Sequence, residues 1–379
     1  MLCLPVWGNQ VSAQTPESYA VLDEATGTLT FRHDAKKPAG AYPLNSPEEL
    51  PGWFAEGEDE DIVTKNRIEK VVFDASFAAA RPTSCRCWFV GCTELKTIDG
   101  IEYLNTENVV TMKSMFAFCN NLTALDVSNF DTKNVTDMSG MFYGCNNLTT
   151  LNVSNFDTKK VTNMKSMFNN CKNLTALDVS NFDTQNVTDM GWMFFGCNNL
   201  TTLNVSNFDT KNVTNMRCMF YGCNNLTTLN LSNFDTKNVT DMGGMFYECG
   251  NLSELNLSNF DTQNVTDMDW MFYDCNSLTA IYVGDKFVTT ACVPSENMFS
   301  GCKKLVGAVP FDENKTGMEM ANYTTGYFTD IKTTGIDATP ISDNIAAKYY
   351  DVQGRRIDAP QKGINIVKRG GRTMKVLMK

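Results

Sequence analysis

Cysteine is the residue with metal-binding or redox chemistry that recurs most regularly in this sequence. Seven cysteines lie 26 residues apart, and Cys92 and Cys302 extend the series by steps of 27 residues; the seven are Cys119, Cys145, Cys171, Cys197, Cys223, Cys249 and Cys275. Zinc needs ligands that converge, usually as close pairs, whereas only Cys85 and Cys87 are near each other in the sequence. Side chains stacked in register point the same way. We therefore expect buried, reduced packing thiols and neither a metal nor a cofactor.

Carboxylates and histidine, which serve in general acid–base catalysis, are placed unfavourably for an enzyme. The aspartates recur in the same way as the cysteines, in the series Asp131, Asp157, Asp183, Asp209, Asp235 and Asp261. A glycosidase needs two unique carboxylates, and calcium needs six or more oxygens in a compact loop. The only histidine is His33, near the N-terminus. We expect turn-capping aspartates and a protein that is not an enzyme.

The elements that position these residues follow from the 26-residue period, which is typical of stacked repeats. Leu148, Leu151, Val153 and Phe156 follow a strand pattern, and Asn134 with Asp137 fits a capped helix start. An apolar series then has helical spacing: Val135, Met138, Met141, Phe142 and Cys145. This pattern predicts an α/β solenoid, a leucine-rich-repeat right-handed superhelix in which each repeat has a short strand and a short α or 3-10 segment.

Stacking would align identical residues into rows along such a solenoid. One predicted structural row consists of Phe130, Phe156, Phe182, Phe208, Phe234 and Phe260. The cysteines would form a second row. A third row consists of Asn129, Asn155, Asn181, Asn207, Asn233 and Asn259, and its amides would bond to the backbone of adjacent turns.

The rest of the chain departs from the repeat. The predicted divisions are residues 1–13, a truncated signal peptide or disordered terminus; 14–66, an N-terminal β-hairpin cap; 67–330, the solenoid with its terminal cap; 331–342, a linker; and 343–379, a small all-β C-terminal unit. The net charge of −11 disfavours nucleic acid as a partner, and no apolar run is long enough to span a membrane. We expect a monomer.

The repeats resemble the BspA-like leucine-rich-repeat surface proteins, with "NVTDMSGMFYGCNNLTTLNVSNFDT" at residues 134–158 as the best copy. The tail from Tyr349, beginning "YYDVQGRRI", is similar to the C-terminal sorting domains of the type IX secretion route. The resemblance implies export, display at the cell surface or release, and adhesion to host matrix proteins, glycans or other bacteria. It supplies no catalytic residues.

Differences between repeats indicate where a partner would bind, since packing already explains the constant positions. The candidate ligand-binding residues are Tyr143, Trp192, Phe195, Tyr221, Tyr247, Trp270 and Tyr273. Exposed aromatic side chains on a rigid scaffold favour a protein or sugar partner. The alternative is that these rings seal gaps in the core left by residues such as Gly191. The strand side, varied mainly by Asp126, Asp178 and Glu254, is not expected to be the main contact surface.

Two functions remain open at this stage. The first is a non-enzymatic adhesin-like binding protein that holds an extracellular protein or glycan. The second is a structural spacer at the cell surface without a ligand of its own.

Overall fold

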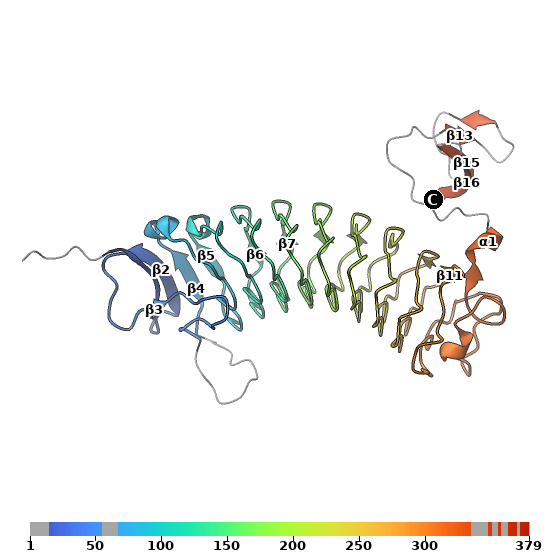
Figure 1. Cartoon of the computed structure of the whole chain (residues 1–379), viewed down its shortest axis with the longest axis horizontal. Coiled ribbons are helices and arrows are strands. Elements are labelled where there is room, and N and C mark those ends of the chain that lie inside the picture. The colour runs from blue at the N-terminus through green and yellow to red at the C-terminus, as the bar shows by residue number, and fades with distance from the viewer. Residues whose placement is uncertain are drawn as a thin grey trace, which may run out of the picture.

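The computed structural model describes residues 15–54, 67–334, 348–350, 355–357, 363–369 and 372–378. Figure 1 shows a row of stacked coils that follows an N-terminal β-sheet. One coil is one 26-residue repeat. Because each coil contacts its neighbours in the row, residues 26 apart in sequence become neighbours in space.

A five-stranded sheet covers the N-terminal end of the row (Figure 1). Its order is β3-β1-β2-β4-β5, and its strands are β1 (Glu17–Asp23), β2 (Thr28–Asp34), β3 (Tyr42–Pro43), β4 (Lys70–Phe73) and β5 (Thr97–Asp99). The predicted hairpin is confirmed, because β1 and β2 pair antiparallel. β4 and β5 then continue the sheet in parallel and lead into the coils. Phe31 stacks on Phe73 and Trp88 here, which closes the apolar end of the row.

Short parallel strands mark one side of the coils. They are β6 (Ala124–Leu125), β7 (Thr150–Leu151), β8 (Ala176–Leu177), β9 (Thr202–Leu203), β10 (Glu254–Leu257) and β11 (Ala280–Val283). β6 pairs with β7, β8 with β9, and β10 with β11. A second side is joined by single parallel bridges through Ser84, Thr111, Asp137, Asn163, Asp189, Asn215, Asp241 and Asp267.

The predicted α/β leucine-rich-repeat solenoid is wrong. Within the described residues the only α-helix is α1 (Ile331–Thr334), which follows the coils, and the 3-10 segments η1 (Ala75–Ala79), η2 (Ile101–Tyr103) and η3 (Met318–Met320) lie outside the regular repeats. The segment from Ser139 to Gly144 consists of turns. The chain is therefore built from short β-strands, bridges and turns.

Backbone hydrogen bonding explains why this segment is not a helix. The N–H groups of Gly140, Phe142 and Gly144 donate to the next coil, at 2.7–2.9 Å, instead of to their own segment. Gly140 and Gly144 also have positive φ, which interrupts a right-handed helix. The apolar residues at helical spacing are buried as expected, but they lie on turns and not on a helix. The spacing shows which side chains face inward, and it does not determine the backbone that carries them.

The predicted helix cap is also wrong. Asn134 Nδ2 donates to the carbonyl of Glu107 in the preceding coil. Asp137 accepts from Ser139 N–H at 2.8 Å, which closes a local turn. Both side chains therefore stabilise coil contacts and turns.

The predicted rows of identical residues are present, with the phenylalanines and cysteines buried and the asparagines nearer the surface. The predicted phenylalanines are at most 2% exposed, and Asn181 Nδ2 donates to the carbonyls of Val153 and Phe156. Each buried thiol in the series from Cys119 to Cys302 donates to a phenylalanine carbonyl of the preceding coil, as Cys197 does to Phe168 at 3.1 Å. These bonds satisfy backbone groups that would otherwise be buried without partners.

The most regular ring stack is a different row of phenylalanines. Its rings are 5.5–5.9 Å apart from one coil to the next, and it consists of Phe89, Phe116, Phe142, Phe168, Phe194, Phe220, Phe246, Phe272 and Phe299. All are fully buried.

The C-terminal part closes the row and then forms a separate sheet. β12 (Thr329–Asp330) pairs with β11, and α1 lies within the predicted linker. The four-stranded sheet has the order β14-β13-β15-β16, from β13 (Lys348–Tyr350), β14 (Arg356–Ile357), β15 (Gly363–Arg369) and β16 (Arg372–Met378). The predicted signal at residues 1–13 and most of the predicted linker lie outside the described residues.

Candidate binding surface

The coils contain two series of positions with positive φ, between 52° and 82°. The first is occupied by Cys87, Ser114, Gly140, Ser166, Trp192, Cys218, Gly244 and Trp270. The second is occupied by Gly91, Phe118, Gly144, Asn170, Gly196, Gly222, Glu248, Asp274 and Gly301. Glycine is the residue that takes this conformation without steric cost, and an L-residue costs roughly 1–2 kcal/mol. Side chains other than glycine at these positions therefore need a reason.

The predicted aromatic residues lie beside these positions and form a row of stacked rings. Centroid distances are 4.3 Å from Phe195 to Tyr221, 4.3 Å from Tyr221 to Tyr247, and 4.7 Å from Tyr247 to Tyr273. Tyr143 instead contacts Phe118 in a tilted arrangement, with 53° between the ring planes, and Asn169 separates it from the row. The structure therefore brings four of the seven candidates into one continuous stack.

The stack is half-buried. Ring planes from Tyr221 to Tyr273 are within 8° of parallel, so neighbouring rings cover each other's faces. Burial raises the pKa of Tyr221 and of Tyr247. A sugar that stacks on an aromatic face would find few free faces here.

The two candidate tryptophans differ in their surroundings. Trp192 is half-buried, and Lys165 Nζ from the preceding coil lies 4.9 Å from its ring centre. Trp270 is 42% exposed, and the residue equivalent to Lys165 in its preceding coil is Gly243. Asn215 packs beside Gly191, because a Cβ atom there would meet its side-chain nitrogen at 2.9 Å.

Two carboxylates flank the tyrosines at the second left-handed position. Glu248 N–H donates to the carbonyl of Tyr273, which places the Glu248 and Asp274 coils in register. Burial, then the adjacent Asp274, raises the pKa of Glu248. We call Tyr247, Glu248, Trp270, Tyr273 and Asp274 the aromatic-acidic patch.

An ion-pair network spans three coils next to this patch. Arg217 Nη1 lies 2.6 Å from Asp267 Oδ2 and 3.5 Å from Asp241 Oδ1. Gly243 leaves room for this guanidinium, since a Cβ atom there would be 2.6 Å from Nη1. Burial raises the pKa of Asp241, while Arg217 opposes that rise.

We expect Arg217→Met to lower the free energy of unfolding by about 1 kcal/mol at pH 7, because half-exposed pairs contribute little more than this. The loss should shrink as the pH falls through the pKa of Asp241, which lies above the ordinary aspartate value of about 3.9. A carboxyl group with a raised folded-state pKa costs stability when it is ionised and costs nothing once it is protonated in both states. Denaturant unfolding at pH 7 and pH 3 measures both effects.

Lys211→Met is the matched control, because Lys211 pairs with Asp209 on a more exposed surface. Its effect should stay within about 0.5 kcal/mol. An Arg217→Met loss that is the same at both pH values would contradict the proposed role of Arg217.

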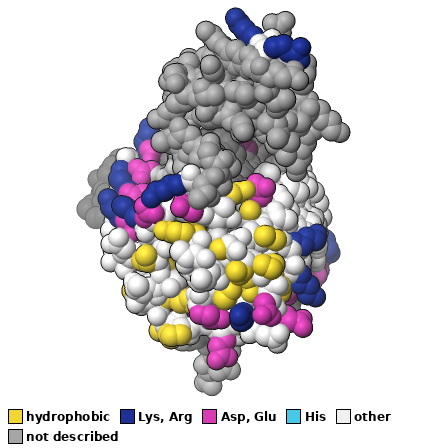
Figure 2. All heavy atoms as spheres, turned by 90° about the vertical axis from the view of Figure 1, so that its right-hand side faces the viewer, with side chains coloured by type: hydrophobic (Ala, Val, Ile, Leu, Met, Phe, Trp, Pro, Cys, Tyr) yellow, Lys and Arg dark blue, Asp and Glu magenta, His cyan; other side chains and the backbone are white. Residues whose placement is uncertain are grey.

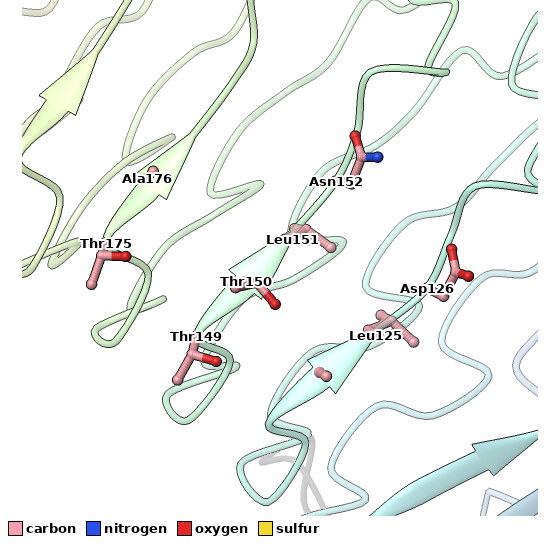
Figure 3. Close-up of a pocket in the computed structure, with 9 residues that line it drawn as sticks. Leu125, Asp126, Thr149, Thr150, Leu151, Asn152, Thr175 and Ala176 are labelled. Atoms are coloured by element: carbon pink, nitrogen blue, oxygen red, sulfur yellow. The ribbon is translucent and has the colours of Figure 1, made fainter.

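The strand side carries an open hollow of about 500 Å³ over β6, β7 and β8 (Figure 3). Figure 3 shows that its lining side chains are short, with Thr149, Thr150 and Asn152 beside Leu151 and Asp126. A similar hollow of about 370 Å³ lies over β8 and β9. Neither is lined by aromatic or arginine side chains, which usually contribute most to protein recognition.

The C-terminal end of the row also exposes apolar side chains. Figure 2 views this end, with hydrophobic side chains in the middle of its described part and charged ones around them. Val293 is 75% exposed and Val306 is 55% exposed.

The regularly spaced cysteines and the histidine lie away from this surface in structural contacts. Burial raises the pKa of Cys145 and Cys197 to about 12, so these thiols are protonated at neutral pH. His33 Nδ1 lies 2.8 Å from the Ser18 hydroxyl on the N-terminal sheet. No group of three or more His, Cys, Asp or Glu side chains suited to a metal occurs in the part of the chain that the structure describes.

The sequence did not predict the Arg217 network, the Lys165 contact or the two carboxylates of the patch. One signal was available for the carboxylates. Gly144, Gly196 and Gly222 each directly precede a cysteine of the 26-residue series. Glu248 and Asp274 stand in that place in their own coils. The alignment of repeats reveals these exceptions, although the positive φ that gives them meaning comes from the structure.

The architecture defines a repeat protein of stacked β-coils with capped ends. Residues 83–203 and 188–310 match the family described as "Mycoplasma protein of unknown function, DUF285", and the chain belongs to this family. No curated protein matches the chain. No helix within the described ranges has the length and hydropathy of a membrane span.

Proposed function

We propose that this protein is a non-enzymatic, exported binding protein of the BspA-like type that holds an extracellular protein or glycan at the cell surface or after release. The resemblance of its tail to type IX sorting domains supports the export route. The alternative, a spacer without a ligand, does not account for strained side chains on one side of the coils.

One observation carries the proposal. Trp270 is 42% exposed at a left-handed position that Gly140 and Gly244 occupy in other coils. Glycine there would avoid the steric cost, and an exposed ring contributes little to the core. A tryptophan that lowers stability without packing inside is expected where it binds something.

A variant test follows from the strain. We expect Trp270→Gly to weaken binding to a partner strongly while leaving the thermal midpoint within a few degrees of wild type, since glycine relieves roughly 1–2 kcal/mol at this site. The full chain would first be screened against extracellular-matrix proteins and glycans, and affinity and thermal unfolding of the variant would then be measured.

The control changes the strand side of the coils instead. Asp126→Lys, Asp178→Lys and Glu254→Lys together reverse the charges of the strand side and should preserve binding. Loss of binding in this control, with binding retained by the tryptophan variant, would assign the partner to the strand side. Failure of the wild-type chain to bind any member of the panel would favour the spacer.

A further inference from the structure

Within the row, one tryptophan already binds a cation of its own chain. Lys165 Nζ is 4.9 Å from the centre of the Trp192 ring, the range in which an ammonium is attracted to the π-face. Lys165 immediately precedes the first left-handed position of its coil, and Trp192 occupies that position in the next coil. The backbone fixes this relation, because Ser166 N–H donates to the carbonyl of Gly191 at 2.9 Å.

The same arrangement recurs at Trp270 without the lysine. Gly243 stands at the place of Lys165, and Gly244 N–H donates to the carbonyl of Asp269 at 2.8 Å, so the register is the same. Arg217 passes Gly243, but its guanidinium is bound by Asp267 and Asp241. Lys165 with Trp192 is the one cation–π pair in the described part of the chain. The higher exposure of Trp270 agrees with a ring face that no cation covers.

The charge around Trp270 suits an incoming cation. Glu248 and Asp274 replace the glycines found at equivalent positions in other coils, and their carboxylates form no ion pair within the described residues. Gly301 makes room for Asp274, because a Cβ atom there would lie 2.0 Å from Asp274 Oδ1. Tyr273 N–H donates to the carbonyl of Trp270, and Glu248 N–H donates to the carbonyl of Tyr273, so backbone hydrogen bonds link Trp270 through Tyr273 to Glu248, and Asp274 directly follows Tyr273.

We propose that the aromatic-acidic patch binds a lysine or arginine side chain of a partner protein, with the cation over Trp270 and beside the carboxylates of Glu248 and Asp274. This proposal rests on the proposed binding function and specifies the class of partner: a protein segment that presents a basic side chain. The partner's cation takes the place that Lys165 has at Trp192.

The experiment uses the full chain and a synthetic peptide of alternating lysine and glycine, with a glutamate–glycine peptide for comparison. Isothermal titration at low ionic strength would measure the affinities. We expect the lysine peptide to bind and the glutamate peptide not to bind. Trp270→Gly should weaken binding about 3- to 30-fold, the range that cation–π interactions give. Glu248→Gln with Asp274→Asn should weaken binding and reduce its dependence on salt.

Trp192→Gly is the matched control, because Lys165 already covers that ring. Its affinity for the lysine peptide should stay within about 2-fold of wild type, as expected for a surface change outside the contact. Equal losses in Trp192→Gly and Trp270→Gly, or an unchanged affinity in Trp270→Gly, would overturn the proposal. If the chain binds a partner in the screen but not the lysine peptide, the proposed cation recognition is refuted and the proposed binding function is not. A chain that binds neither would refute the proposed function as well.

Discussion

Phe194→Ala is expected to lower the free energy of unfolding by about 3–5 kcal/mol, the usual cost of removing a fully buried phenylalanine ring. Phe194 is fully buried, with the rings of Phe168 and Phe220 at 5.8 and 5.9 Å. Because coils are stabilised by their neighbours, the cavity weakens the contacts on both sides of its coil. Guanidinium unfolding followed by circular dichroism measures the loss and shows whether the transition becomes broader.

The adjacent residue provides a control of the same type. Phe195 is half-buried and stacks on Tyr221 at 4.3 Å, in the outer row. Phe195→Ala should cost about 1 kcal/mol, the contribution of one stacked aromatic pair with part of its burial. Similar losses at both positions would contradict the distinction between a core row and an outer row.

Sequence reasoning predicted the parts of this structure that depend on which side chains are buried. The 26-residue cysteine period gave the register, and the buried phenylalanines, the thiols and the Asn181 contacts follow from that register. These features depend on the repetition of side chains, which the sequence displays directly. The hairpin of β1 and β2 was also predictable, because its turn and alternating pattern are local.

The backbone of the coils could not be predicted in the same way. Val135, Met138, Met141, Phe142 and Cys145 have the spacing of a helix, and their burial satisfies that spacing. Whether an N–H group donates within its segment or to the next coil depends on a neighbour that is distant in sequence. Here the N–H groups alternate: one donates to the next coil and the following one donates within its own segment. This alternation excludes an α-helix, although the same apolar side chains are buried.

The aromatic residues of the candidate surface were singled out from the sequence, whereas its two carboxylates and its geometry were not. Four of the variable aromatic residues lie in one stack, but their rings cover each other's faces, and Trp192 and Trp270 differ in whether a lysine is present. A helical reading places Trp270 beside Tyr273, and the turn also does so, since Tyr273 N–H donates to the Trp270 carbonyl. The left-handed backbone at Trp270 cannot be recognised from one repeat alone. It is recognised by comparison with Gly140 and Gly244, which occupy the same position in other coils.

A row of buried threonines provides the second large effect. Thr210 is fully buried, and its hydroxyl donates to the carbonyl of Asp235 at 2.9 Å and accepts from the N–H of the same residue at 2.8 Å. The same pair of bonds occurs at Thr236 with Asp261. One hydroxyl thus satisfies both backbone groups of a residue in the next coil.

Thr210→Val keeps the shape of the side chain and removes both bonds, so the carbonyl and the N–H of Asp235 lose their partners. Each buried polar group left without a partner costs about 1–3 kcal/mol, and we expect a total loss of about 2–5 kcal/mol in the free energy of unfolding. Thr214→Val is the control: Thr214 is exposed, its hydroxyl donates to the carbonyl of Thr188 at 3.2 Å, and water can replace that bond. Its cost should stay within about 0.5 kcal/mol, as for most surface substitutions. Denaturant unfolding of the two variants gives the comparison, and equal costs would show that the hydroxyl of Thr210 does not link the coils.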